Sequence, residues 1–157
     1  MNLSRFSTFR FSPPRLNPPR GFGVVALGIV LVDQLTKWLV VNAGTILTAG
    51  PLRIGAVYNR EGVLGLPIDN GILLVAGVTI SALLGYWLTR SFRPEVRAGF
   101  WLLLAGAASN TLDRIQYDGV LDIVAIGPTA HFNVADLAII TGAGILVTIL
   151  WRRGQDD

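Results

Sequence analysis

Three aspartates in the C-terminal half of the chain could together perform acid–base chemistry. Asp113 ends the segment SNTLD, Asp122 lies within GVLDIV, and Asp136 ends HFNVAD. Carboxyl groups that lie close together in a low-dielectric site share a proton, so that one is neutral while the other is charged. The charged carboxylate can take a proton from water while the neutral one polarises a peptide carbonyl, which is the chemistry of an aspartic protease. The spacing does not say which two aspartates would form the pair.

Amide and guanidinium side chains accompany these acids. Asn110 and Asp113 are three residues apart and so share a helical face, and Arg114 could hold a neighbouring carboxylate ionised. The amides could orient the carboxyl groups by hydrogen bonding. A structural interpretation is also open, because Asn133 could cap a helix and Asp136 would interact favourably with the dipole of its first turn.

A second ionisable pair lies far upstream, within an apolar segment. Asp33 and Lys37 are four residues apart, so on a helix they lie on one face and can form an ion pair. Ionisable side chains in an apolar span are costly and call for a partner or a function. A structural ion pair that faces a helix bundle accounts for both residues without contact with a substrate.

Composition excludes several other kinds of site. The chain has no cysteine, which excludes disulfides, thiolate metal sites and a cysteine nucleophile. We see no metal-ligand cluster and no phosphate-binding loop, and therefore expect neither a metal nor a cofactor. The sequence pI near 10.0 would suit a nucleic-acid-binding protein. However, the net charge is only +3 and 52% of residues are hydrophobic, so we predict a membrane protein surrounded by lipids, with no nucleic-acid partner.

Four apolar segments must position these side chains. Residues 71–89 carry no charge and nearly cross a hydrocarbon core of about 30 Å at about 1.5 Å per residue. Residues 21–42 are apolar except near Asp33 and Lys37. Residues 98–112 and 137–151 reach spanning length only by taking in Asp113 and Asp136. The sequence therefore predicts four transmembrane helices.

Basic residues predict the orientation of these helices. Four crossings place nine arginines on one side of the membrane, which the positive-inside rule makes the cytoplasm: Arg5, Arg10, Arg15, Arg20, Arg90, Arg93, Arg97, Arg152 and Arg153. Both termini are then cytoplasmic. We expect a Pro/Arg-rich cytoplasmic tail over residues 1–20, a four-helix transmembrane domain over 21–152, and a short cytoplasmic tail over 153–157.

Two connections remain on the outer side. Residues 43–70 are rich in β-branched residues, glycine and proline, which favour short strands and turns at the membrane surface. Residues 114–133 form a second segment of this kind. The predicted fold class is an all-α membrane protein with four transmembrane helices and a small extracytoplasmic β-rich element between the first and second helices.

Four motifs in order, VDQLTKWLV, YNREGVLG, AGAASNTLDRIQYDGVLDIV and HFNVADLAI, resemble those of the lipoprotein signal peptidases (signal peptidase II). The resemblance runs from about residue 24 to 150. It implies an intramembrane aspartic endopeptidase in the bacterial cytoplasmic (inner) membrane. Its substrates would be diacylglyceryl-modified prolipoproteins, cut before the lipidated cysteine.

The resemblance also assigns roles to individual residues. The catalytic pair would be Asp122 and Asp136. Supporting or substrate-binding roles would fall to the family's other polar positions: Asp33, Lys37, Asn59, Asn110, Asp113, Arg114 and Asn133.

Two departures from the family pattern alter the expected local structure. In NREGVLG, Glu61 stands where the family has glycine and Leu64 where an aromatic residue is usual. We expect Gly62 to absorb the turn one residue later, with Asn59 still directed towards the pair. In AGAASN, Ala105 and Ser109 replace glycines, and both are small enough for close helix packing.

Two functions of other classes remain open. The acids could form a relay in a proton-coupled membrane transporter, although transporters commonly have more spans and inverted repeats than are visible here. Alternatively, a non-catalytic membrane subunit could pair these acids with partner helices. The sequence does not give the oligomeric state.

Overall fold

The computed structural model describes residues 21–44, 47–60, 66–90 and 93–156. The expected tail over residues 1–20 and the expected turn at Glu61 and Gly62 lie outside these ranges. Within these ranges the chain forms four helices: α1 (Gly21–Ala43), α2 (Asn70–Arg90), α3 (Pro94–Tyr117) and α4 (Val134–Asp156). Four strands accompany them: β1 (Leu47–Ala49), β2 (Leu52–Asn59), β3 (Val120–Ile126) and β4 (Ala130–Phe132).

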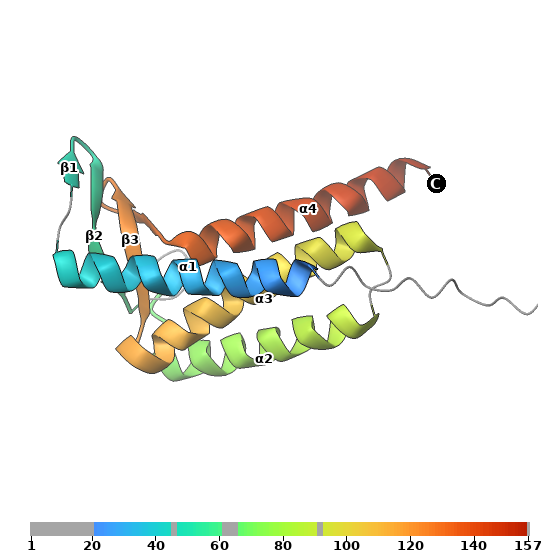
Figure 1. Cartoon of the computed structure of the whole chain (residues 1–157), viewed down its shortest axis with the longest axis horizontal. Coiled ribbons are helices and arrows are strands. Elements are labelled where there is room, and N and C mark those ends of the chain that lie inside the picture. Colours follow the sequence, from blue (N-terminus) through green and yellow to red (C-terminus); the bar gives the residue numbers. More distant parts are fainter. Residues whose placement is uncertain (1–20, 45–46, 61–65, 91–92, 157) are drawn as a thin grey trace, which may run out of the picture.

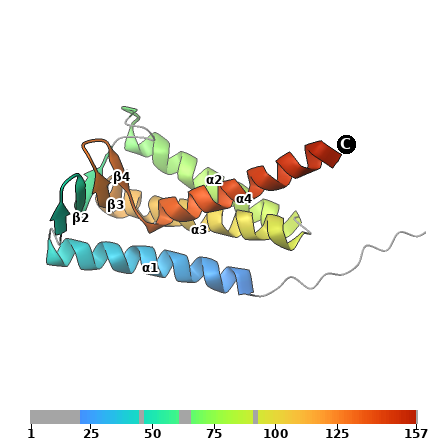
Figure 2. The same ribbon diagram turned by 90° about the horizontal axis from the view of Figure 1, so that it is seen from above.

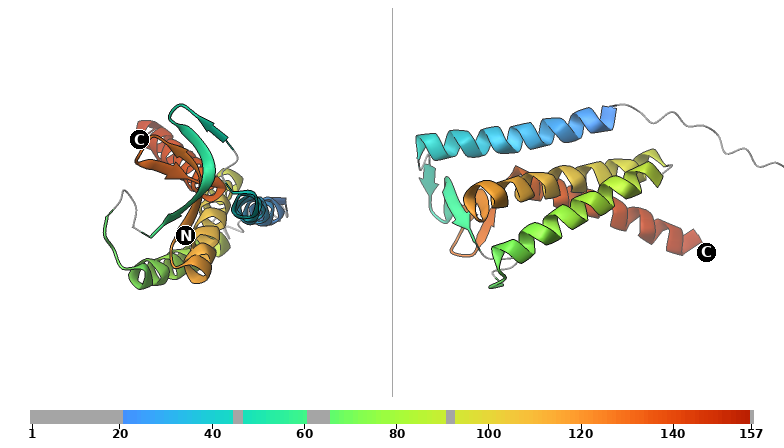
Figure 3. Two further views of the ribbon diagram at one scale, coloured as in Figure 1. Left: turned by 90° about the vertical axis from the view of Figure 1, so that its left-hand side faces the viewer. Right: turned by 90° about the horizontal axis from the view of Figure 1, so that it is seen from below.

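The helices run along the long axis of the molecule, and the strands gather at one end of them (Figure 1). Successive helices run in opposite directions, so α1 begins and α4 ends at the end remote from the strands. The other views place α3 in the middle of the bundle (Figures 2 and 3), where it contacts α1, α2 and α4. The α3 helix is thus the central element of the bundle.

Helices α1, α2 and α4 are each long and apolar enough to cross a membrane. Their outward surfaces carry many exposed apolar side chains, among them Leu31, Val75 and Ile140. The 24-residue α3 is less apolar and does not meet the same measure. Its role as a fourth span therefore stays a prediction.

Two helices differ in extent from the expectation. The α3 helix continues to Tyr117, so Arg114 is helical rather than part of the outer connection. The α4 helix begins at Val134 and includes Asp136, as the required span length predicted. It also continues to Asp156, into the segment expected as a tail.

The strands form one antiparallel sheet with the order β1-β2-β3-β4. Strands β1 and β2 come from the connection between α1 and α2, and β3 and β4 from the connection between α3 and α4. The β-rich element is therefore not confined to the region between the first two helices, as the predicted fold class placed it. Both connections have strand-forming composition, but only the tertiary fold brings them together in one sheet.

An irregularity in β2 changes the face of the sheet on which the side chains after it lie. Ile54 pairs with Val124 and Val57 pairs with Asp122, so two residues of β2 lie opposite one residue of β3. This is the count of a β-bulge. Because side chains alternate along a strand, the extra residue moves Asn59 to the face that carries the Asp122 side chain.

Small residues let α3 and α4 pack closely. A Cβ atom added at Gly142 would lie 2.7 Å from the carbonyl oxygen of Gly99 and 3.0 Å from the backbone nitrogen of Leu103. Small residues at such crossings allow helix backbones to approach one another in membranes. The crossing matters for function because α3 and α4 carry most of the polar residues described below.

We predict that Gly142→Ala destabilises the protein by about 1–3 kcal/mol, because the methyl group has no room at the crossing. Gly144→Ala is the matched control, since a Cβ atom there meets nothing within 4 Å. The control should be neutral or slightly stabilising through its higher helix propensity. Thermal unfolding of both variants in detergent measures the difference, and equal unfolding temperatures would contradict the packing argument.

Candidate active site

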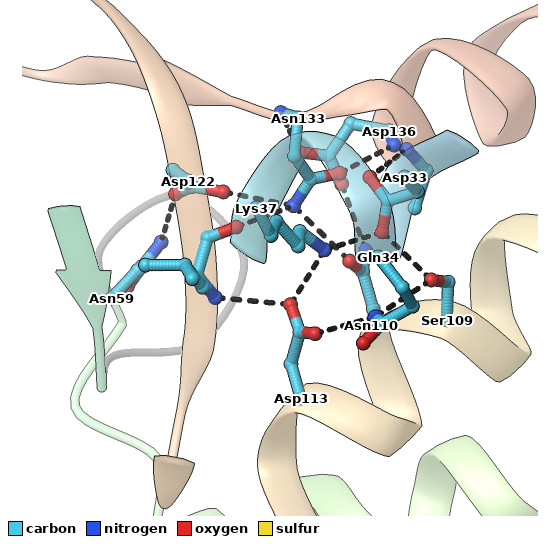
Figure 4. Close-up of polar contacts among 12 residues, drawn as sticks. Asp33, Gln34, Lys37, Asn59, Ser109, Asn110, Asp113, Asp122, Asn133 and Asp136 are labelled. Atoms are coloured by element: carbon cyan, nitrogen blue, oxygen red, sulfur yellow. Dashed lines mark hydrogen bonds and ion pairs between the residues drawn. The ribbon is translucent and has the colours of Figure 1, made fainter. Parts of the chain in front are cut away.

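Asp122 and Asp136 meet at the end of the bundle that carries the sheet, joined by a single asparagine (Figure 4). The Asn133 side-chain nitrogen donates to Asp122 Oδ1 at 3.0 Å. The Asn133 side-chain oxygen accepts the backbone N–H of Asp136 at 2.9 Å, and the Asn133 N–H donates to Asp136 Oδ2 at 3.1 Å. One residue therefore holds both aspartates that the family resemblance singled out.

The contacts between Asn133 and Asp136 form a capping box at the start of α4. In a capping box, the residue before the helix and the residue three positions later each bind the other's backbone N–H. The structural interpretation of these residues as helix caps is therefore correct in its geometry. It does not compete with a chemical role, because Asn133 reaches Asp122 with the same amide.

Two further amides hold the carboxyl groups. Asn110 on α3 donates to Asp136 Oδ1 at 2.9 Å, and its own oxygen accepts from the Asn133 side chain at 3.2 Å. Asn59 on β2 donates to Asp122 Oδ2 at 3.4 Å, as expected for a residue directed towards the pair. The bulge in β2 places Asn59 on this face.

A glycine lets β3 lie close to Asn59. A Cβ atom on Gly119 would lie 2.7 Å from the Asn59 carbonyl oxygen. The preceding Asp118 has a positive φ of 56° and ends α3 in a left-handed cap. The short sequence YDGVLD therefore ends a helix, turns and enters β3 within a few residues, which brings Asp122 close to the helix ends.

Asp122 is almost fully buried, with 2% of its surface exposed, whereas Asp136 is partly exposed. Burial and then the nearby charge of Asp136 raise the pKa of Asp122 to about 6. The hydrogen bonds from Asn59 and Asn133 act in the opposite direction, as does the charge of Lys37. Asp122 therefore keeps a proton at pH values where an ordinary aspartate has lost it.

Asp33, Lys37 and Asp113 form a second, fully buried cluster beside this pair. The Lys37 ammonium lies 2.5 Å from Asp33 Oδ2 and 2.6 Å from Asp113 Oδ2. Each of the three residues is at most 1% exposed. The ion pair expected between Asp33 and Lys37 is confirmed, and its orientation towards the bundle follows from this burial. The partnership of Lys37 with Asp113 was not predicted.

Asp113 and Arg114 have partners other than those their adjacency suggested. Asp113 accepts hydrogen bonds from Lys37, from the Gln34 side chain and from the Leu121 backbone N–H. Arg114 instead donates to the side-chain oxygen of Asn70 at 2.9 Å. Within the described ranges, both contact ion pairs involve Lys37, whereas Arg114 interacts with Asp113 and Asp122 electrostatically without such a contact.

Three participating residues were missed as site members. Gln34 donates to Ser109 and Asp113, and Ser109 donates to Asp33 Oδ2 at 2.7 Å. The sequence pattern indicates Ser109 only as a small residue in a helix-packing position. Asn70 joins the start of α2 to the end of α3 through Arg114 and Asp118. The available signal was the same for Gln34 and Ser109, namely a polar side chain within an apolar segment.

The arrangement suits proton transfer. Two carboxyl groups interact electrostatically, and the amides of Asn59, Asn110 and Asn133 fix their orientation without supplying a titratable group. Among the described residues, no group of three or more His, Asp or Glu side chains could hold a metal ion. A carboxyl pair of this kind can activate water and protonate a leaving group.

We predict that Asp136→Asn lowers the pKa of Asp122, because removal of a neighbouring negative charge makes ionisation of Asp122 easier. Carbon NMR of isotope-labelled aspartate carboxyl groups measures this pKa, with a midpoint near 6 in the unmodified protein. Asp118→Asn is the control, because Asp118 is exposed and bonds to Asn70 instead. An unchanged Asp122 midpoint in Asp136→Asn would show that the two carboxyl groups do not interact.

Known proteins resemble this chain in fold and in sequence. Two solved bacterial membrane enzymes, both determined by the in meso method, share the fold. One has a TM-score of 0.78 with 20% identity and covers 88% of this chain and 92% of its own. The other has a TM-score of 0.71 with 22% identity and covers 83% of this chain and 93% of its own.

Sequence relatives extend this likeness. The lipoprotein signal peptidase of Symbiobacterium thermophilum is 31% identical over 148 residues, which cover 83% of this chain and 96% of that protein. The lipoprotein signal peptidase of Methylobacterium sp. is 30% identical over 153 residues, with 87% and 92% covered. The family model described as signal peptidase (SPase) II matches residues 25–152, and the chain therefore belongs to the signal peptidase II family.

Proposed function

We propose that this protein removes signal peptides from prolipoproteins as an intramembrane aspartic endopeptidase, with Asp122 and Asp136 as the catalytic pair. Its membership of the signal peptidase II family supports the reaction. The observation that carries the choice of residues is the bridge made by Asn133, which holds Asp122 and Asp136 together. Asp113 is the weaker candidate, because Lys37 occupies its carboxylate.

In the proposed reaction, one carboxylate of the pair takes a proton from water, and the resulting hydroxide attacks the scissile carbonyl carbon. The protonated partner hydrogen-bonds to the carbonyl oxygen as negative charge develops on it. Collapse of the tetrahedral intermediate breaks the C–N bond, and the leaving amine receives a proton from the pair. Asn59, Asn110 and Asn133 keep both carboxyl groups in position during these steps.

The proposed membrane arrangement has four spans and both termini in the cytoplasm. Three observations support it. The direction of the chain alternates from helix to helix (Figure 1). The described arginines Arg90, Arg93, Arg97, Arg152 and Arg153 lie near the helix ends remote from the sheet. Finally, α3 is enclosed by three apolar helices, so it needs less hydrophobic surface of its own to span the membrane.

This arrangement puts the pair where a lipidated substrate would present its scissile bond. The sheet end would be extracytoplasmic, in the bacterial inner membrane, with Asp122 and Asp136 at the outer ends of the helices. Acyl chains on a substrate cysteine remain in the bilayer and so hold the neighbouring peptide bond near its surface. We therefore propose a diacylglyceryl-modified prolipoprotein as substrate, cut before the modified cysteine. The domain division at residues 20 and 152 is part of the same proposal.

We predict that Asp122→Asn and Asp136→Asn each lower the cleavage rate by about 10²- to 10⁴-fold, because an amide cannot transfer the required proton. The measurement is cleavage of a lipidated prolipoprotein peptide by purified protein in detergent. A transporter or a non-catalytic subunit would not cleave this peptide at all.

Asp118→Asn is the matched control for this prediction. Asp118 ends α3 in the left-handed region, which asparagine also adopts readily, and it lies at the same end of the bundle. Its activity should equal that of the unmodified protein. Substantial turnover in either pair variant would overturn the assignment of the pair.

The membrane orientation gives a further prediction. Because the chain has no cysteine, single reporters can be introduced without other changes. Thr48→Cys on β1 should react with a membrane-impermeant maleimide in intact spheroplasts. Gln155→Cys near the end of α4 should react only after the membrane is permeabilised. The opposite pattern would reverse the proposed orientation, and equal labelling of both sites would contradict an even number of spans.

A further inference from the structure

Lys37 is the only lysine in the chain, whereas the other twelve basic residues are arginines. It is also the most deeply buried cation described, with 1% of its surface exposed. A lysine ammonium is a compact charge with three donors, and a guanidinium is larger, planar and rigid. A chain that uses arginine at every other basic position has lysine where one small cation must contact two carboxylates.

Each of the two carboxylates that contact Lys37 also accepts a hydrogen bond from a backbone N–H group. Asp33 Oδ1 accepts the backbone N–H of Ala135 at 2.9 Å. Asp113 Oδ2 accepts the backbone N–H of Leu121 at 3.1 Å. Ala135 immediately precedes Asp136, and Leu121 immediately precedes Asp122. Each carboxylate therefore anchors the backbone N–H of the residue that precedes one member of the proposed pair.

These contacts form a continuous connection between α4 and β3. It runs from the Ala135 N–H through Asp33, Lys37 and Asp113 to the Leu121 N–H, and Figure 4 shows its three side chains beside the pair. The connection joins residues far apart in sequence, since Asp33 and Ala135 are separated by 102 positions.

We propose that Lys37, with Asp33 and Asp113, is a positioning device that sets the separation of Asp122 and Asp136. This inference rests on the proposed function of the pair. None of the three residues needs to touch the substrate. They act by fixing the backbone immediately before each acid, while Asn133 joins the two acids through its own side chain. Misplacement of a reacting group by about 1 Å can cost about 100-fold in rate.

The first test compares the kinetics of folded variants. Lys37→Arg keeps the positive charge but cannot make two short contacts in the same space, and Lys37→Gln removes the charge. Each should lower kcat by about 100-fold while KM for the lipidated peptide stays unchanged. If charge alone mattered, Lys37→Arg would have normal kcat, and that result would overturn the proposal.

Thr36→Val is the matched control. Thr36 lies on the same helix next to Lys37, and its hydroxyl donates to the backbone carbonyl oxygen of Asp33 at 2.9 Å rather than to a carboxylate of the cluster. Its loss removes one hydrogen bond from α1 and leaves both anchors in place, so kcat should stay close to that of the unmodified protein. A purely structural role would instead give both Lys37 variants a lower unfolding temperature and a normal kcat in the folded fraction. That pattern would also overturn the proposal.

The second test does not depend on activity. Because Lys37 is the only lysine, protein labelled in the lysine side-chain nitrogen gives a single ammonium NMR signal. Asp33→Asn and Asp113→Asn should each shift this signal and each lower kcat, and they serve as the kinetic variants if Lys37→Gln does not fold. A signal that responds to only one of them would show that Lys37 does not bridge the two carboxylates.

The two tests separate this inference from the proposed function. If the unmodified protein cleaves no lipidated prolipoprotein peptide, the proposed function fails. The NMR signal then still decides whether the bridge exists. If the unmodified protein cleaves the peptide while both Lys37 variants retain normal kcat, the proposed function stands and the positioning role is wrong.

Discussion

The structure depends on the cost of burying charge in an apolar bundle. Asp33, Lys37 and Asp113 have almost no exposed surface, so each charge must find its partners within the protein. Lys37 contacts Oδ2 of both carboxylates, and these two oxygens also accept from Ser109 and from the Leu121 backbone N–H. The other two carboxylate oxygens accept from the Ala135 backbone N–H and from Gln34. Removing one member would leave another charge buried without compensation. The requirement for complete pairing therefore fixes how α1, α3, α4 and β3 approach one another.

The close approach of α3 and α4 also allows buried polar groups to find partners. Gly99 and Gly142 remove side-chain bulk at their crossing, and Gly106 lies against the Ala135 carbonyl near the start of α4. The short side chains of Asn110 and Asn133 can then reach across the interface between the helices. In an apolar bundle, small residues thus do more than permit packing, because they bring short polar groups within hydrogen-bonding distance.

Local patterns in the sequence predicted much of the secondary structure and one of the ion pairs. Apolar segments gave the helices, and the spacing of Asp33 and Lys37 gave their ion pair. Arg114 interacts electrostatically with Asp113 and Asp122, but its hydrogen bond goes to Asn70, because adjacency in sequence does not determine which side chains meet in space. The single sheet could not be predicted either, since the pairing of β2 with β3 joins residues 61 to 74 positions apart and includes a bulge that composition does not reveal. The proposed pair itself came from the family resemblance, because spacing alone left three aspartates equivalent.

The start of α4 shows why the structural and chemical interpretations of one motif agree. The capping box of Asn133 and Asp136 forms from local contacts as soon as the first turn of the helix exists. That geometry directs one Asp136 oxygen to the Asn133 backbone and leaves the other for Asn110. The Asn133 side-chain nitrogen remains available for Asp122, which arrives on β3 from the neighbouring element. A helix start signal thus orients one acid of the proposed pair through local contacts, and the tertiary contact made by Asn133 adds the other.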